Sequence, residues 1–123
     1  MARKKANPDL VRVKHMIDAL AEALRFARGK SRQDLGRERL LALALIKDIE
    51  IAGEAASRVS DAFKRRHPQI PWHAVVATRN RLIHGYFAVD LDIVWRTVEK
   101  NLRPLLSALR RIAEKQTPRK KKY

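Results

Sequence analysis

Apolar residues recur at alternating intervals of three and four along most of this chain, and this spacing constrains its fold most strongly. Asn7, followed by Pro8 and an acid, predicts the start of a first helix, and Gly29 predicts its end. Residues so spaced share one face of a helix, so the chain must bury long helical stripes against one another. The first stripe consists of Leu10, Val13, Ile17, Leu20, Leu24 and Ala27.

Four further helices follow from the same pattern. We predict one long helix over 33–57, a short one over 61–66 and a third main helix over 71–84. Asp90 is the expected N-cap of the last helix, in which Pro104 should cause a kink or a division. The predicted fold is therefore all-α, an up-and-down bundle of four main helices with a fifth, short one.

Basic residues dominate the charge of the chain. The 123 residues include 28 Lys and Arg against 13 Asp and Glu, a formal charge of +15. We predict one helical domain over 7–115, between basic tails at 1–6 and 116–123. Seven positive charges lie in the tails, where they could simply aid solubility, so the remaining body still carries +8. A body this basic attracts RNA, DNA, an acidic protein or anionic lipid.

The chain contains no cysteine, which excludes disulfides, thiolate zinc sites and cysteine nucleophiles. Its longest apolar run, over 40–46, is far too short to span a bilayer. No apolar segment follows the basic N-terminal residues, as one would in a signal peptide. We therefore expect a cytoplasmic protein without a membrane partner.

The segment TRNRLIHGYF, residues 78–87, concentrates chemically active side chains at a predicted helix end. Helical spacing places Arg79 within an apolar stripe, where a charge without a partner would be very costly. Glu54, within the apolar segment IEIAGEAA, is the expected partner. Two interpretations remain open: a structural ion pair that joins two helices, or an arginine that receives an anionic ligand.

His84 lies five residues after Arg79, roughly 140° around the helix, on a second face with His73 and Asn80. A histidine at this helix end could simply interact with the helix dipole. Metal binding has little support, because the chain has no HExxH or similar histidine pair. RNA cleavage fits better, since histidine transfers protons near neutral pH and arginine holds phosphate oxygens. The reaction needs an acid and a base, which a two-fold dimer would supply from two copies.

These residues match a known pattern. RNRLIHGY reads as Arg-x4-His followed by His-x-Tyr, and it stands between HPQIPW and YFAVDLDIVW, with IEIAGEAA upstream. In this order the segments resemble the HepT toxins, members of the HEPN superfamily of small helical ribonucleases. The resemblance covers residues 10–112 approximately, nearly the whole predicted domain.

The resemblance implies a helical homodimer with a composite, metal-independent ribonuclease site and no cofactor. Arg79 and His84 would be the catalytic pair, and Asn80 and Arg81 would bind the RNA phosphates. It also implies a partner, an antitoxin of the MNT nucleotidyltransferase type. This enzyme would place AMP on Tyr86 and so block RNA from the site.

Two other functions are compatible with parts of the pattern. Related helical proteins act as non-catalytic, substrate-binding partners of nucleotidyltransferases, and Arg79 and His84 would then hold structure or a nucleotide. A basic DNA-binding module ranks last, because the sequence has no recognisable helix-turn-helix.

Overall fold

The protein folds as an all-α bundle. The computed structural model describes residues 7–84 and 90–116, without the side chains of residues 83, 84 and 116, and this part contains no strand. The all-α prediction is thus confirmed. The helices of the described part are α1 (Pro8–Ala27), α2 (Arg32–Arg37), α3 (Arg39–Ser57), α4 (Asp61–Arg66), α5 (Trp72–His84), α6 (Leu91–Arg96), the π-helical segment η1 (Thr97–Asn101) and α7 (Leu102–Gln116).

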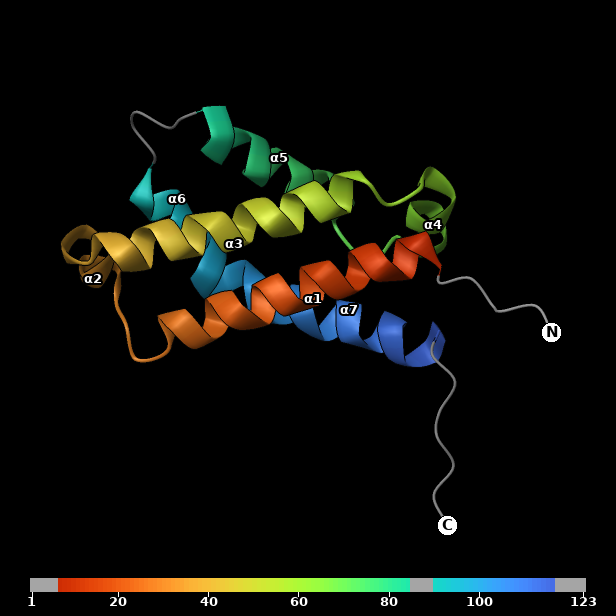
Figure 1. Ribbon diagram of the computed structural model, residues 1–123, viewed down its shortest axis with the longest axis horizontal. Coiled ribbons are helices and arrows are strands. Elements are labelled where there is room, and N and C mark those ends of the chain that lie inside the picture. The colour runs from red at the N-terminus through yellow and green to blue at the C-terminus, as the bar shows by residue number, and fades with distance from the viewer. Residues whose placement is uncertain (1–6, 85–89, 117–123) are drawn as a thin grey trace, which may run out of the picture.

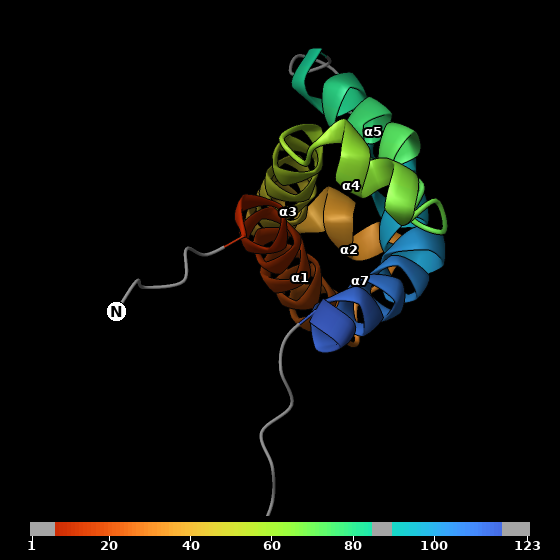
Figure 2. The ribbon, with the colours of Figure 1, turned by 90° about the vertical axis from the view of Figure 1, so that its right-hand side faces the viewer.

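Four long helical segments surround the core, namely α1, α3, α5 and the run from α6 through η1 to α7. Helix α1 packs between α3 and α7, and α5 packs on the other flank of α3 (Figures 1 and 2). Asp9 ties the start of α1 to the start of α4, because its carboxylate accepts from the backbone N–H of Ser60 at 2.8 Å and from the Ser60 hydroxyl at 2.7 Å. The largest fully buried side chains are Phe63, Met16, Leu20, Leu35, Leu45, Ile70, Leu109, Val13 and Val94.

The predicted limits of the first helix are confirmed. Asn7 Oδ1 accepts from the N–H of Asp9 at 2.9 Å, and Pro8 occupies the first turn, where no N–H partner is needed. The chain leaves the helix through Gly29, whose φ of +73° is readily adopted only by glycine. The helix therefore starts and ends where local backbone chemistry dictates.

The prediction of one helix over 33–57 was wrong, because the chain breaks at Glu38. Ser31 and Asp34 form a capping box, in which the Asp34 carboxylate accepts from the Ser31 N–H at 2.8 Å. The short helix α2 buries Leu35, and Glu38 leaves helical geometry with φ −110° and ψ 91°. The apolar spacing is interrupted here, because residues 36–39 (GRER) carry no apolar side chain, and no side chain caps α3 at Glu38.

The last predicted helix begins at its expected cap and is divided, as Pro104 predicted. Asp90 Oδ1 accepts from the N–H of Asp92 at 2.8 Å. Between α6 and α7 the turn widens into η1, where the N–H of Leu102 reaches back to the carbonyl of Thr97. Pro104 cannot donate to the carbonyl of Lys100, and in a regular α-helix its ring would clash with that carbonyl. The widening occurs in the turn that carries this carbonyl.

The segment HPQIPW fixes the start of α5. The indole N–H of Trp72 donates to the carbonyl of His67 at 3.0 Å, and its ring packs edge-on against Phe63. Helix α5 then runs from Trp72 to His84, which confirms the helix predicted over 71–84. None of the helices in the described part is both long enough and apolar enough to cross a membrane.

Candidate active site

A close approach between α3 and α5 positions Arg79. Gly53, buried in α3, lies against the Arg79 side chain. A Cβ at position 53 would overlap the Cβ of Arg79, and it would lie 2.7 Å from the Arg79 Cγ and 3.3 Å from the carbonyl oxygen of Val75. The absence of a side chain at Gly53 thus allows Arg79 to enter the helix interface.

The Arg79 guanidinium is held from two directions. Its Nη2 donates to Glu54 Oε2 at 2.5 Å, and its Nη1 donates to the amide oxygen of Asn80 at 2.7 Å. The side chain is 27% exposed, and its buried Nε has no partner in the described part of the chain. A guanidinium has five N–H donors, so this one is fixed in orientation and can still donate to an anion.

Glu54 is shared between two arginines. Its second oxygen accepts from Arg58, with Nε and Nη2 each 3.0 Å away. The hydrogen bond from Arg58, together with the charge of Arg79, lowers the pKa of the Glu54 carboxyl. Glu54 therefore stays ionised near neutral pH and cannot supply a proton. The three side chains together keep one net positive charge.

Arg79 lines a groove of about 320 Å³ between α1, α3 and α5. Arg12 and His15 reach it from α1, and Lys47 reaches it from α3. In residues 7–84 and 90–116, neither Arg12 nor Lys47 has a carboxylate within 4.0 Å. Four cationic side chains thus line the groove against the two carboxylates of Glu50 and Glu54. The electrostatic potential in the groove is therefore positive and favours the binding of a phosphate. The full lining is Arg12, His15, Lys47, Glu50, Ile51, Glu54, Ala55, Arg58 and Arg79.

The other predicted site residues divide into two groups. Asn80 is half-buried and bonds to Arg79 directly, whereas Arg81 and His73 are exposed on α5 and do not line the groove. His84 is the last residue of α5, and its side chain lies outside the described part. Tyr86 also lies outside the described residues. Sequence reasoning missed Arg12, His15, Lys47 and Arg58, which come from other helices.

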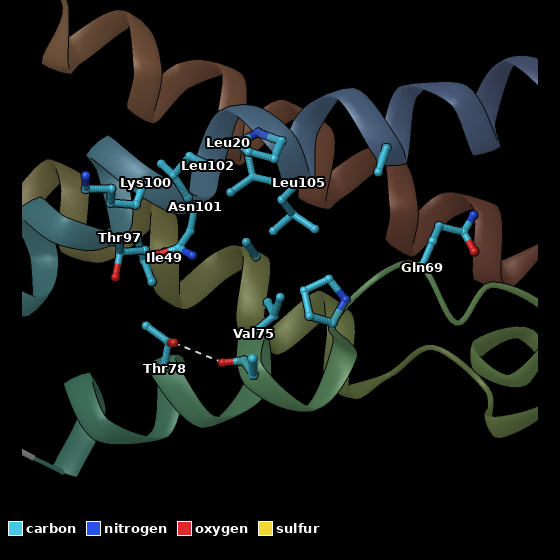
Figure 3. Close-up of a pocket in the computed structure, with 15 residues that line it drawn as sticks. Leu20, Ile49, Gln69, Val75, Thr78, Thr97, Lys100, Asn101, Leu102 and Leu105 are labelled. Carbon is cyan, nitrogen blue, oxygen red and sulfur yellow. Dashed lines mark hydrogen bonds between the residues drawn. The ribbon is translucent and has the colours of Figure 1, made fainter.

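A second pocket, of about 260 Å³, lies between α5 and the segment from η1 to α7 (Figure 3). Thr78, the residue before Arg79, lines it and donates its hydroxyl to the carbonyl of Ala74 at 2.9 Å. Leu20, Leu102 and Leu105 contribute apolar walls. Because Arg79 is absent from this lining, adjacent residues of α5 serve two separate hollows.

The described residues contain no group of three or more His, Cys, Asp or Glu side chains that could hold a metal ion. The polar atoms around Arg79 instead come mainly from cationic side chains. Such a set is suited to an anionic ligand.

Comparison with known proteins identifies the family. Residues 16–112 match the family described as ribonuclease HepT-like, a segment that includes Glu54, Arg79 and His84. The chain belongs to the HepT-like family. The resemblance seen in the sequence is therefore confirmed, and the HepT-like fold places the arginine of the Arg-x4-His segment beside a cationic groove.

Several relatives carry ribonuclease names. A protein of Thermococcus cleftensis named as a probable ribonuclease HepT is 35% identical over 96 residues, covering 75% of this chain and 87% of the relative. A protein of Caldanaerobacter subterraneus, provisionally named as an RNase, is 28% identical and covers 85% of this chain and 93% of the relative. One from Methanocaldococcus jannaschii with a similar name is 26% identical, covering 71% and 80% respectively. No solved structure matches this chain.

Proposed function

We propose that this HepT-like protein is a metal-independent endoribonuclease and the toxin of a toxin–antitoxin pair. The observation that carries the proposal is the anchored Arg79, which faces a cationic groove five residues before His84 in the sequence. Membership of the HepT-like ribonuclease family supports the same activity. The substrate is RNA, whose 2′-hydroxyl provides the nucleophile.

The proposed reaction is an internal transesterification. One His84 removes the proton of the 2′-hydroxyl, whose oxygen then forms a bond to the adjacent phosphorus. The bond from phosphorus to the 5′-oxygen breaks, and a second His84 protonates that oxygen. Arg79 donates to the non-bridging oxygens as charge develops on them. The products are a 2′,3′-cyclic phosphate and a free 5′-hydroxyl.

The second His84 would come from a second copy of the chain. In the described part, all the exposed large apolar side chains lie on α1 and α3. Ile51 also lines the groove of Arg79, so a copy seated on this face would adjoin the groove. We propose a homodimer through this face, which would bring two Arg79–His84 pairs to one cleft. The exposed apolar residues are Val11, Phe26, Leu40, Leu43 and Ile51.

Control of the toxin would act through Tyr86. In this proposal an MNT-type nucleotidyltransferase antitoxin transfers AMP from ATP to the Tyr86 hydroxyl and releases pyrophosphate. Tyr86 lies two residues after His84, so the added phosphodiester would compete with RNA for Arg79.

Cleavage of total RNA or tRNA in excess EDTA tests the proposed activity. Wild type should produce 2′,3′-cyclic phosphate ends, and His84→Ala should lose at least a hundredfold in rate, because general acid–base catalysis contributes about 10²–10⁴-fold. His73→Ala is the matched control, since His73 is exposed on the same helix and does not line the groove. Full activity in His84→Ala would refute the catalytic assignment. A folded wild type that cuts neither RNA would instead favour a non-catalytic partner of a nucleotidyltransferase.

Incubation with the nucleotidyltransferase, ATP and Mg²⁺ tests the control step. The wild type should gain one AMP and lose cleavage, whereas Tyr86→Phe should remain unmodified under the same conditions. Modification at a residue other than Tyr86 would contradict the assignment.

A further inference from the structure

Four arginines converge on a groove of about 310 Å³ between α1 and α7. Arg25 and Arg28 come from the end of α1, and Arg103 and Arg110 come from α7. All four residues are exposed. The remaining lining is apolar, so no carboxylate faces the four guanidinium groups within the groove. The other lining residues are Ala21, Leu24 and Leu106.

Folding alone does not account for this cluster. Within the described residues, none of the four arginines has a carboxylate within 4.0 Å, and like charges at close range repel. The helix dipole favours Arg25 and Arg28, which lie at the C-terminal end of α1. The helix dipole does not explain the positions of Arg103 and Arg110, because both lie within the helical run from η1 to α7 and not at its end. Guanidinium groups without acidic partners are suited to phosphate oxygens.

This arginine groove lies on the opposite flank of α1 from the groove of Arg79. At about 100° and 1.5 Å per residue, Arg28 lies roughly 140° around the helix from His15 and roughly 20 Å along it. Figure 2 shows α1 between α3, which borders the groove of Arg79, and α7, which borders the arginine groove. A ligand that occupied both would have to pass around the outer surface of α1.

We propose that the α1–α7 arginine groove binds the phosphate backbone of an RNA substrate at a distance from the cleavage site. The identity of the polyanion as RNA rests on the proposed ribonuclease function. Contacts of this kind position the RNA and add affinity without reading its bases. The groove should therefore affect binding and KM, and it should leave the rate of the chemical step unchanged.

Binding to an uncleavable RNA measures this role without catalysis. The probe is a fluorescently labelled hairpin in which every 2′-hydroxyl is methylated, followed by anisotropy at several salt concentrations. The test variant is Arg103→Gln with Arg110→Gln, because Arg25 also acts on the buried Asp48. The control is Arg37→Gln with Arg65→Gln, which removes two exposed arginines that line neither groove.

Loss of two phosphate contacts should weaken binding about tenfold near 0.1 M salt and reduce the salt slope by about 1.5. The control should change the Kd by less than about threefold, since it alters only the net charge. Cleavage of a dinucleotide too short to span roughly 20 Å should proceed at the wild-type rate in both variants. Its KM should also be unchanged.

The other outcomes of the binding and cleavage experiments also show whether the arginine groove binds RNA. Equal losses in the two variants would show that net charge alone matters, and they would overturn the proposal. Failure of wild type to bind the hairpin would overturn it too, as would a poly-glutamate peptide that binds the groove more tightly than RNA. A wild type that binds the hairpin through the groove but cuts no RNA would overturn the proposed ribonuclease function, and the groove would then be an RNA-binding surface without a cleavage site.

Discussion

At the scale of single residues, Asp48 is the unusual member of the core. It is 2% exposed on α3, and its Oδ2 has no partner in the described part of the chain. Burial, followed by the hydrogen bond and charge of Glu22, raises the pKa of Asp48 to about 7, although Arg25 opposes the shift. The folded protein therefore favours the neutral form of Asp48 below about pH 7.

The raised pKa predicts that stability falls as pH rises. Between about pH 4 and pH 7 the unfolded chain loses the Asp48 proton while the folded protein keeps it, so the free energy of unfolding declines across this window. Asp48→Asn should remove this decline. Relative to wild type it should gain about 1–3 kcal/mol between pH 4 and pH 8, measured by urea unfolding.

Asp18→Asn is the control for this prediction, because it removes an exposed carboxylate from α1 and should keep the wild-type pH dependence. Parallel curves for wild type and Asp48→Asn from pH 4 to pH 8 would contradict the raised pKa of Asp48.

The contacts of Arg79 show how far sequence reasoning reaches at this scale. An arginine inside an apolar stripe needs a partner, and Glu54 was the candidate because it is a carboxylate within the apolar segment IEIAGEAA. The structure places Glu54 Oε2 at 2.5 Å from Arg79 Nη2. Arg12 and His15 gave no such signal, because they are ordinary polar residues of α1 whose role depends on where α1 meets α3. The sequence shows that a buried charge needs a partner, but it does not show which polar residues of another helix lie near the site.

At the scale of elements, Gly53 controls the approach of α3 to α5. In Gly53→Ala the new methyl group would overlap Arg79 and crowd the Val75 carbonyl, so one of the two helices must shift. The variant should lose about 1–3 kcal/mol in the free energy of unfolding, as overpacked cores do. RNA cleavage should fall as well, because Arg79 would move relative to Glu54.

Gly36→Ala provides the matched control for this prediction. A Cβ there meets nothing within 4 Å, and alanine favours a helix by up to about 1 kcal/mol, so this variant should be neutral or more stable. Thermal unfolding of both variants makes the comparison. Equal stability of Gly53→Ala and Gly36→Ala would show that the two helices do not depend on close contact at Gly53.

Element boundaries were predictable where a local chemical signal marked them. Asn7, Asp90 and Pro104 each act on the backbone within one turn, and the structure bears out all three. The break at Glu38 has no side-chain cap, because the capping box of Ser31 and Asp34 marks only the start of α2. Periodicity reports which residues face the core, and it does not report whether one helix carries them.

At the scale of the whole molecule, the described surface has distinct regions. Exposed apolar side chains gather on α1 and α3, and a cluster of unpaired arginines lies between α1 and α7. A surface that binds a second copy of the chain should be apolar at its centre, and a surface that binds RNA should be basic. None of the residues that line the arginine groove belongs to the exposed apolar set, so the proposed dimer would leave this groove open to RNA.

The dimer proposed through α1 and α3 predicts the effect of a charge on that face. Leu43 is 47% exposed, so Leu43→Glu should leave the fold intact, but a dimer would have to bury the new carboxylate without a partner. The Kd for dimerisation should rise at least about a hundredfold, which corresponds to about 3 kcal/mol. Sedimentation velocity should then show a monomer at micromolar concentration.

Ala62→Glu controls for net charge, because Ala62 is exposed on α4, which carries none of the exposed apolar side chains and lines neither groove. It should remain dimeric and active. Cleavage by Leu43→Glu should fall together with dimer content, since a monomer keeps Arg79 but has only one His84 to act as both acid and base. A monomeric Leu43→Glu with the full wild-type rate would show that one chain holds a complete site, and the composite mechanism would then be wrong.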